Sequence, residues 1–209
     1  MALRAGGSSF GRRARPAAGG QGLTQDRSPG RESDRPEREA DPVDVARQIC
    51  LHQLEHAPRT RAELAAVLTR RGVEEQVAEQ VLGRLSEVGM IDDALFAQMW
   101  VSSRHRGRGL AGRALSHELR GKGIDDELVR EAVGTLEPEQ ELATARALVD
   151  RRLKATSGLA TEVRVRRLAG MLARKGYPAG LAFRVVREAL AAEGVDPDLV
   201  PDPDVATAG

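Results

Sequence analysis

Residues 112–136 read GRALSHELRGKGIDDELVREAVGTL, and two other segments of the chain share their pattern. Residues 61–85 read RAELAAVLTRRGVEEQVAEQVLGRL, and residues 165–189 read VRRLAGMLARKGYPAGLAFRVVREA. Aligning the three segments superimposes five apolar positions and one glycine in each: Gly72, Gly123 and Gly176. Because these glycines are 51 and 53 residues apart, the pattern indicates a supersecondary unit that occurs three times.

Each segment has the sequence signature of a helix, a glycine turn and a second helix. Leucines stand eight and four residues before the glycine, so they share one face of a helix. Glycine favours the left-handed conformation that ends a helix. The next helix then begins with acids or proline, which suit a helix N-terminus: Glu74 and Glu75, Asp125 and Asp126, and Pro178.

A further helix is predicted before each pair, over residues 43–56, 92–104 and 138–155. Asp41-Pro42, Asp92 and Glu137-Pro138 mark the starts of these helices, and their apolar positions include Val45, Phe96, Met99, Trp100 and Val149. Thr60 and Glu63 have the spacing of a capping box for the helix that follows. The predicted fold is all-α, with three tandem three-helix repeats (43–90, 91–137 and 138–192) forming an elongated, curved array.

Composition separates this helical region from the two ends of the chain. Residues 1–42 are rich in Gly, Pro, Ser and Arg without apolar periodicity, and residues 193–209 contain five acids and no base. We predict that both are disordered tails. The chain has a single cysteine, Cys50, for which we expect inert burial, and no apolar run of about 20 residues that could span a membrane. A cytoplasmic protein is the resulting expectation.

Basic residues gather on one face of two predicted helices. On a helical wheel, Arg113, His117 and Arg120 lie opposite Leu115 and Leu119. The corresponding helix of the third repeat places Arg166, Arg167 and Arg174 opposite its apolar side, within a span, 164–187, that has seven basic residues and no acid. Such a surface suits a polyanion or an acidic protein face.

Other candidate sites are weaker. Residues 107–112 read GRGLAG, the spacing of a dinucleotide-binding loop, but a helical pattern precedes them where that loop needs a strand. We interpret Gly107 and Gly109 as a corner between helices. His52 and His56 are four residues apart in HQLEH, which a surface helix explains better than zinc. We therefore predict no enzymatic activity, no cofactor and no metal.

The most specific motifs of the chain resemble the RecX regulatory family. The resemblance covers residues 43–192 and rests on Gly89-Met90-Ile91-Asp92-Asp93, Phe96, Trp100, Arg104, Gly107, Glu118-Leu119, Lys122-Gly123-Ile124, Lys175-Gly176-Tyr177 and Phe183. It implies an all-α protein that is not an enzyme. It also implies binding to the RecA recombinase and its single-stranded DNA filament, in the filament groove, which limits strand exchange, ATP hydrolysis and co-protease activity in DNA repair and the SOS response. Single- or double-stranded DNA is a possible direct ligand, and we expect a monomer.

The resemblance also suggests where a partner would bind. By position, we expect the following residues to face RecA or DNA: Arg104, Arg106, Arg108, Arg113, Arg120, Lys122, Arg166, Arg167, Arg174 and Lys175.

Two alternatives remain. Three-helix units also occur in helix-turn-helix transcription regulators, which read DNA with the N-terminus of a recognition helix. In two of the three repeats this position is acidic, which disfavours such a role. The second alternative is a helical adaptor with no nucleic-acid role, which salt-dependent binding to single-stranded DNA would exclude.

Overall fold

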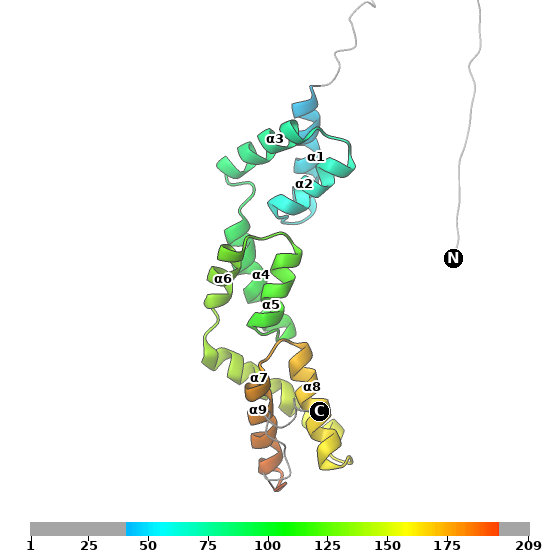
Figure 1. The fold of residues 1–209 in the computed structure, drawn as a ribbon, viewed down its shortest axis with the longest axis vertical. Helices are drawn as coiled ribbons and strands as arrows, with labels where there is room; N and C mark the ends of the chain where they lie inside the picture. The colour runs from blue at the N-terminus through cyan, green and yellow to red at the C-terminus, as the bar shows by residue number, and fades with distance from the viewer. Residues whose placement is uncertain (1–40, 197–209) are drawn as a thin grey trace, which may run out of the picture. The chain divides into compact units, whose positions relative to one another are not determined.

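The computed structural model describes residues 41–196, in which the chain forms nine α-helices, one 3₁₀ helix and no strand (Figure 1). The helices are α1 (Pro42–His56), α2 (Arg61–Arg70), α3 (Glu75–Glu87), α4 (Asp93–Arg108), α5 (Gly112–Gly121), α6 (Asp126–Gly134), α7 (Pro138–Leu153), η1 (Lys154–Thr156), α8 (Thr161–Arg174) and α9 (Ala179–Ala192). They pack as three successive groups, α1–α3, α4–α6 and α7–α9. The prediction of an all-α chain with three three-helix repeats is confirmed.

Each repeat has its own hydrophobic core, built on the predicted leucine pairs. The two leucines that precede each glycine turn are at most 1 % exposed: Leu64 and Leu68, Leu115 and Leu119, and Leu168 and Leu172. Cys50 is fully buried in the core of the first repeat, and this burial raises the pKa of its thiol. Val45 and Met99 depart from the predicted pattern, since both are exposed although the periodicity placed them with core residues.

The predicted capping residues begin the helices. Asp41, Asp92 and Asp125 accept hydrogen bonds from backbone N–H groups at the starts of α1, α4 and α6. Thr60 and Glu63 form both bonds of the capping box at α2. Helix α4 is longer than predicted and includes Gly107, because its backbone bonds continue until Gly109 ends it in the left-handed region.

The three aligned glycines end the middle helix of each repeat in the same way. Their φ angles are 76° at Gly72, 75° at Gly123 and 89° at Gly176. In each case the next residue donates its N–H to the carbonyl of the second leucine, at 3.1–3.2 Å, which is a Schellman motif: Val73 to Leu68, Ile124 to Leu119 and Tyr177 to Leu172. The glycine thus fixes the turn between the second and third helices.

The same motif ends α9 and extends the third repeat. Gly194 has a φ of 84°, the N–H of Val195 donates to Leu190, and Val195 packs against the core. Glu193 forms an ion pair with Arg164, which is only 5 % exposed. Residues 193–196 therefore belong to the third repeat, although the sequence assigned them to the acidic tail. The remainder of both predicted tails, residues 1–40 and 197–209, lies outside the described residues.

Two of the three glycine turns also join one repeat to the preceding one. A Cβ atom added to Gly123 would overlap Ala62 of α2, and one added to Gly176 would lie 2.7 Å from the Cβ of Ala114 in α5. A Cβ at Gly72, in the first described repeat, would meet nothing within 4 Å.

Hydrogen bonds reinforce both junctions. The carbonyl of Lys122 accepts from the Thr60 hydroxyl at 2.8 Å, and that of Lys175 accepts from the N–H of Ala111 at 2.9 Å. At the second junction the buried Tyr177 hydroxyl also donates to the carbonyl of Gly109, at 3.2 Å. The glycine turn of one repeat therefore sits on the beginning of the second helix of the repeat before it.

The three glycines provide a matched test of these junctions. Gly72→Ala places a Cβ in the left-handed region and should lower the free energy of unfolding by about 1–2 kcal/mol. Gly123→Ala and Gly176→Ala add an overlap with a neighbouring helix, so we expect a further loss of about 1–3 kcal/mol. Urea denaturation of the three variants measures this difference, and equal losses at all three positions would contradict the proposed contacts.

The stability of the second junction, between the second and third repeats, should depend on pH because of Tyr177. Burial, with a smaller contribution from the charge of Glu141, raises the pKa of Tyr177 from 10.0 to about 12. Its stabilising contribution should be complete below pH 10 and should disappear as the pH rises towards 12. Since Tyr177 is the only tyrosine, the ultraviolet absorbance of its phenolate reports the titration directly. Titration of the folded protein near pH 10, as in the urea-unfolded chain, would show that the hydroxyl is not buried.

Candidate functional site

The predicted arginines of α5 and α8 are exposed, away from the leucine cores, as the helical wheel predicts, whereas Arg164 of α8 is buried. Arg113, Arg167 and Arg174 are exposed, and none of them forms an ion pair with another described residue. A guanidinium group without an acidic neighbour keeps its full charge available to a partner.

Three adjoining hollows bring these arginines together with others. The first, of about 520 Å³, lies along α7, η1 and α8, and the second, of about 530 Å³, lies between the end of α4, α7 and α8. Arg152 and Met171 line both. The third, of about 440 Å³, lies at α5 and the turn before α9, and it shares Arg174 with the first.

We call the cationic lining of these hollows the basic groove. It comprises Arg106, Arg108, Arg113, Arg151, Arg152, Arg166, Arg167, Arg174 and Lys175, with His117 beside Arg113. No Asp or Glu belongs to the lining of any of the three hollows. A concave surface with charges of one sign concentrates the electrostatic potential and attracts a polyanion.

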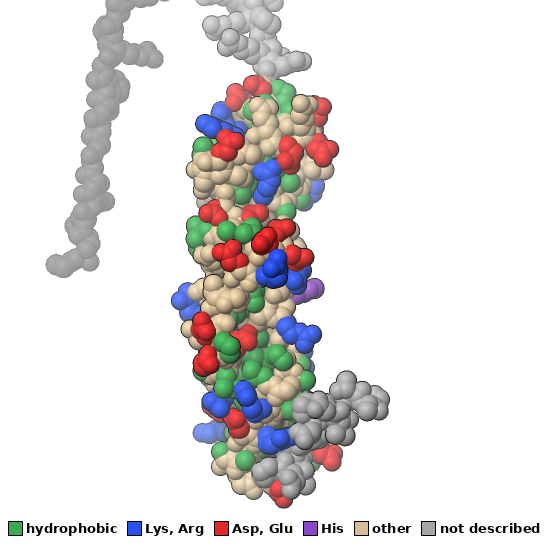
Figure 2. Space-filling model, turned by 60° about the vertical axis from the view of Figure 1, so that its left-hand side comes forward, with side chains coloured by type: hydrophobic (Ala, Val, Ile, Leu, Met, Phe, Trp, Pro, Cys, Tyr) green, Lys and Arg blue, Asp and Glu red, His purple; other side chains and the backbone are tan. Residues whose placement is uncertain are grey.

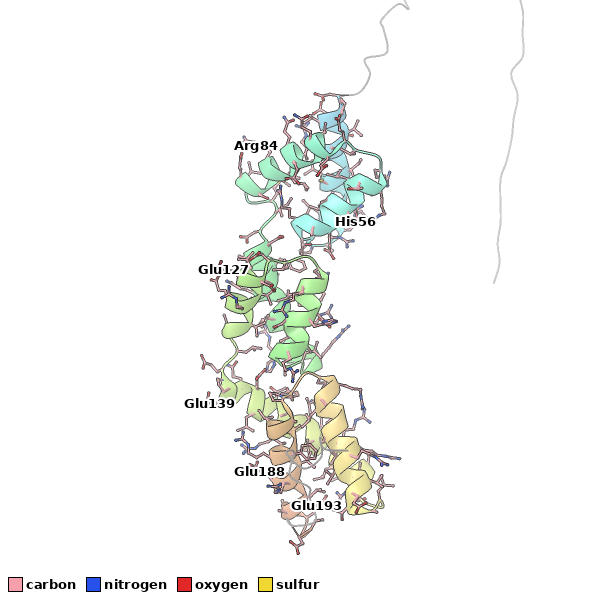
Figure 3. All side chains as sticks on the ribbon, in the orientation of Figure 1. His56, Arg84, Glu127, Glu139, Glu188 and Glu193 are labelled. Carbon is pink, nitrogen blue, oxygen red and sulfur yellow. The ribbon has the colours of Figure 1, made fainter. Side chains whose placement is uncertain are left out.

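Several acidic side chains lie on another side of the repeats, whereas Glu118 and Glu193 pair with Arg108 of α4 and Arg164 of α8. Figure 3 shows Glu127, Glu139 and Glu188 on α6, α7 and α9, on the side away from α8. The face turned forward in Figure 2 has acidic and basic side chains interspersed. The lining of the basic groove, which contains no Asp or Glu, therefore differs from the mixed face in Figure 2.

Seven of the ten predicted binding residues line the basic groove: Arg106, Arg108, Arg113, Arg166, Arg167, Arg174 and Lys175. Lys175 is partly engaged within the chain, since its Nζ donates to the carbonyl of Arg108 at 2.5 Å. Arg120 lies outside the groove and forms an ion pair with Asp126, with 2.6 Å between Nε and Oδ1.

The other two predicted binding residues contact aromatic rings inside the chain. Arg104 lies 4.0 Å from the ring centroid of Trp100, and its Nε is 3.7 Å from a carboxylate oxygen of Glu118. Lys122 lies over the rings of Trp100 and Phe96, and its Nζ is 2.7 Å from Glu63 of the first repeat. Lys122 thus joins the first two repeats with both its backbone and its side chain.

Sequence analysis missed Arg151 and Arg152. They lie in the last turn of α7, where cations also stabilise the helix dipole, so their spacing alone does not distinguish a binding role. The packing of α7 against α8 places them in the groove. Helical wheels of α7 and α8 considered side by side could have indicated that Arg151 and Arg152 belong to the site.

The candidate sites that sequence analysis set aside have structural explanations. Gly109 is the corner before α5, and a helix precedes it where a dinucleotide-binding loop would need a strand. His52 and His56 are exposed on α1, and no group of three or more potential metal ligands occurs in residues 41–196. Within the same residues no helix has the length and apolar character that crossing a membrane requires.

Together, the three tandem three-helix repeats and the basic groove define a helical repeat protein with a cationic concave surface. Family models described as the first, second and third three-helix domains of RecX match residues 46–85, 92–133 and 139–186. The regulatory protein RecX of Thermobifida fusca is 62 % identical over 159 residues, covering 76 % of this chain and 85 % of the relative. RecX of Streptomyces coelicolor is 57 % identical over 162 residues, covering 78 % and 86 %. The chain belongs to the RecX family of regulatory proteins.

Solved structures agree on the fold. The crystal structure of RecX from Lactobacillus salivarius has a TM-score of 0.67 at 18 % identity and covers 73 % of this chain and 99 % of that protein. A second crystal structure, of a regulatory protein RecX, has a TM-score of 0.64 at 21 % identity and covers 71 % and 73 %.

Lys122 offers a test of the first junction. Lys122→Ala removes the ion pair with Glu63 and the contacts with two aromatic rings, so it should lower the free energy of unfolding by about 1–2 kcal/mol. It should also shift the fluorescence of Trp100, the only tryptophan. The control is the exposed Lys154→Ala, expected to stay within about 0.5 kcal/mol. Equal stability of the two variants would show that Lys122 does not hold the junction.

Proposed function

We propose that this protein is a negative modulator of the RecA recombinase, and that the basic groove binds the RecA filament on single-stranded DNA. It lodges in the filament groove and limits strand exchange, ATP hydrolysis and co-protease activity, in DNA repair and the SOS response. The protein acts by binding, as a cytoplasmic monomer without catalysis or a cofactor. Membership of the RecX family and the cationic lining of the basic groove, in which only Arg108 has an acidic partner among the described residues (Glu118, at 4.0 Å), support this proposal.

The assignment of the site rests on one observation: cations from two joined repeats line the same groove. Arg106 and Arg113 belong to the second repeat, whereas Arg152, Arg167 and Arg174 belong to the third. Because the junction at Gly176 fixes the two repeats against each other, several weak phosphate or carboxylate contacts act as one. Arginine also bonds phosphate and carboxylate in a bidentate manner.

A sequence-specific transcription regulator is the alternative, and the helix termini count against it. A recognition helix meets base edges with its N-terminal residues. Helix α3 begins with Glu74 as its N-cap and Glu75, and α6 begins with Asp125 and Asp126, so two of the three corresponding positions would repel phosphate.

Charge reversal in the groove tests the proposal. The triple variant Arg152→Glu, Arg167→Glu and Arg174→Glu should keep its thermal transition, because all three side chains are exposed. Its inhibition of RecA ATP hydrolysis on single-stranded DNA should need a protein concentration at least about tenfold higher. The loss should be larger at low salt, because exposed charges are screened beyond about 8–10 Å at physiological ionic strength.

A control variant separates local from overall charge. Arg47→Glu, Arg84→Glu and Arg130→Glu change three exposed arginines outside the groove and alter the net charge by the same amount. This variant should inhibit RecA like wild type. If the groove variant, shown to be folded, also inhibits like wild type, the proposed site is wrong.

A further inference from the structure

A fourth hollow lies beside the basic groove and differs from it in chemistry. It has a volume of about 430 Å³ between α4, the turn before α7 and α7 itself. Its lining comprises Val101, Ser102, His105, Arg106, Thr135, Leu136, Gln140, Ala143 and Thr144. Arg106 is the only arginine in this lining. The other lining residues are apolar or have side chains that form hydrogen bonds, and none of them has a carboxylate.

This hollow adjoins the groove directly. Arg106 and Thr144 line both the fourth hollow and the second hollow of the basic groove. A ligand can therefore place an uncharged part in the hollow while its anionic part lies among Arg106, Arg108, Arg151 and Arg152.

The hydrogen bonds of the hollow leave several groups available. His105 Nδ1 lies 2.9 Å from the carbonyl of Leu110, which can only accept, so Nδ1 carries the proton. In the neutral ring Nε2 then accepts from the Thr144 hydroxyl at 3.0 Å. The Thr135 hydroxyl donates to the carbonyl of Ala132, which leaves its oxygen as an acceptor. The side chains of Ser102 and Gln140 form no hydrogen bond with another described residue, so their donors and acceptors are free.

These features match an unpaired nucleobase. A base has an edge of donors and acceptors around a flat apolar ring, and it is joined through a sugar to an anionic phosphate. Sites for small organic groups commonly have volumes of about 300–1,000 Å³, apolar walls and a few polar groups, as this hollow does. A base within a duplex is paired and stacked, so it could enter only from a single strand.

We propose that the hollow beside Arg106 is a subsite for one unpaired base of a single strand whose phosphates follow the basic groove. This inference rests on the proposed function, because it takes the DNA of the RecA filament as the polyanion. It assigns a role to the uncharged side chains of α4 and α7 that phosphate binding leaves unexplained.

The test compares two labelled strands of equal charge. Fluorescence anisotropy measures binding of the full chain to a twelve-nucleotide oligothymidylate and to a twelve-unit strand of abasic sites. Both strands offer the same phosphates, so a difference in affinity reports the bases. We expect the wild type to bind the thymidylate about tenfold more tightly, because one or two hydrogen bonds to a base are worth about this much.

A filled hollow should abolish that preference. Ala143 lines the hollow and is exposed on α7, so Ala143→Leu occupies the space without entering the core. This variant should bind the abasic strand like wild type and lose the preference for thymidylate. The control is Ala147→Leu, one turn further along α7, exposed and outside all four hollows, which should keep it.

Each result has a distinct meaning. Equal wild-type affinity for the two strands, or a preference that Ala143→Leu retains, overturns the base subsite while leaving the phosphate groove in place. Absence of binding to either strand also overturns it. The proposed function is then judged separately, since the RecA ATP hydrolysis assay reports binding to the filament without the free strand.

Discussion

A contact between glycine and alanine holds each repeat on the one before it. At Gly123 against Ala62, and at Gly176 against Ala114, the absence of a Cβ lets the turn approach the neighbouring helix. The same glycine adopts the left-handed conformation that ends its own helix. One residue therefore fixes both the angle inside a repeat and the position of that repeat on its neighbour. The arrangement of the described repeats follows from these two contacts and the hydrogen bonds to the backbone carbonyls of Lys122 and Lys175 beside them.

The basic groove depends on the second of these junctions. Its cations come from α4 and α5 on one side and from α7 and α8 on the other. Tyr177 and Lys175, which flank Gly176, bond to the backbone of Gly109 and Arg108 at the edge of the groove. A change that loosened this junction would separate the arginines without altering any of them. The junction is thus a structural requirement for the site.

The features that could be predicted from the sequence are those that depend on residues close together in the chain. The leucine stripes, the glycine turns and the capping box at Thr60 depend on neighbours within one or two helical turns, so their spacing predicts them well. Lys122 contacts Glu63 of α2 and Trp100 of α4, and Arg104 pairs with Glu118 of α5, so these contacts depend on other helices and the sequence treated both residues as free cations. Only the contact of Arg104 with Trp100, one turn earlier on α4, lies within a single helix. Arg151 and Arg152 became part of the site through helix packing that no single-helix wheel represents.

The central claim is that the surface at the junction of the second and third repeats meets the RecA filament. Amide hydrogen exchange of the full chain, alone and bound to RecA filaments on single-stranded DNA, tests it most directly. We expect slower exchange in residues 104–113 and 164–177, which contain most of the basic groove, and unchanged exchange in α3 and α6. Slower exchange confined to α3 and α6, with residues 104–113 and 164–177 unaffected, would contradict it.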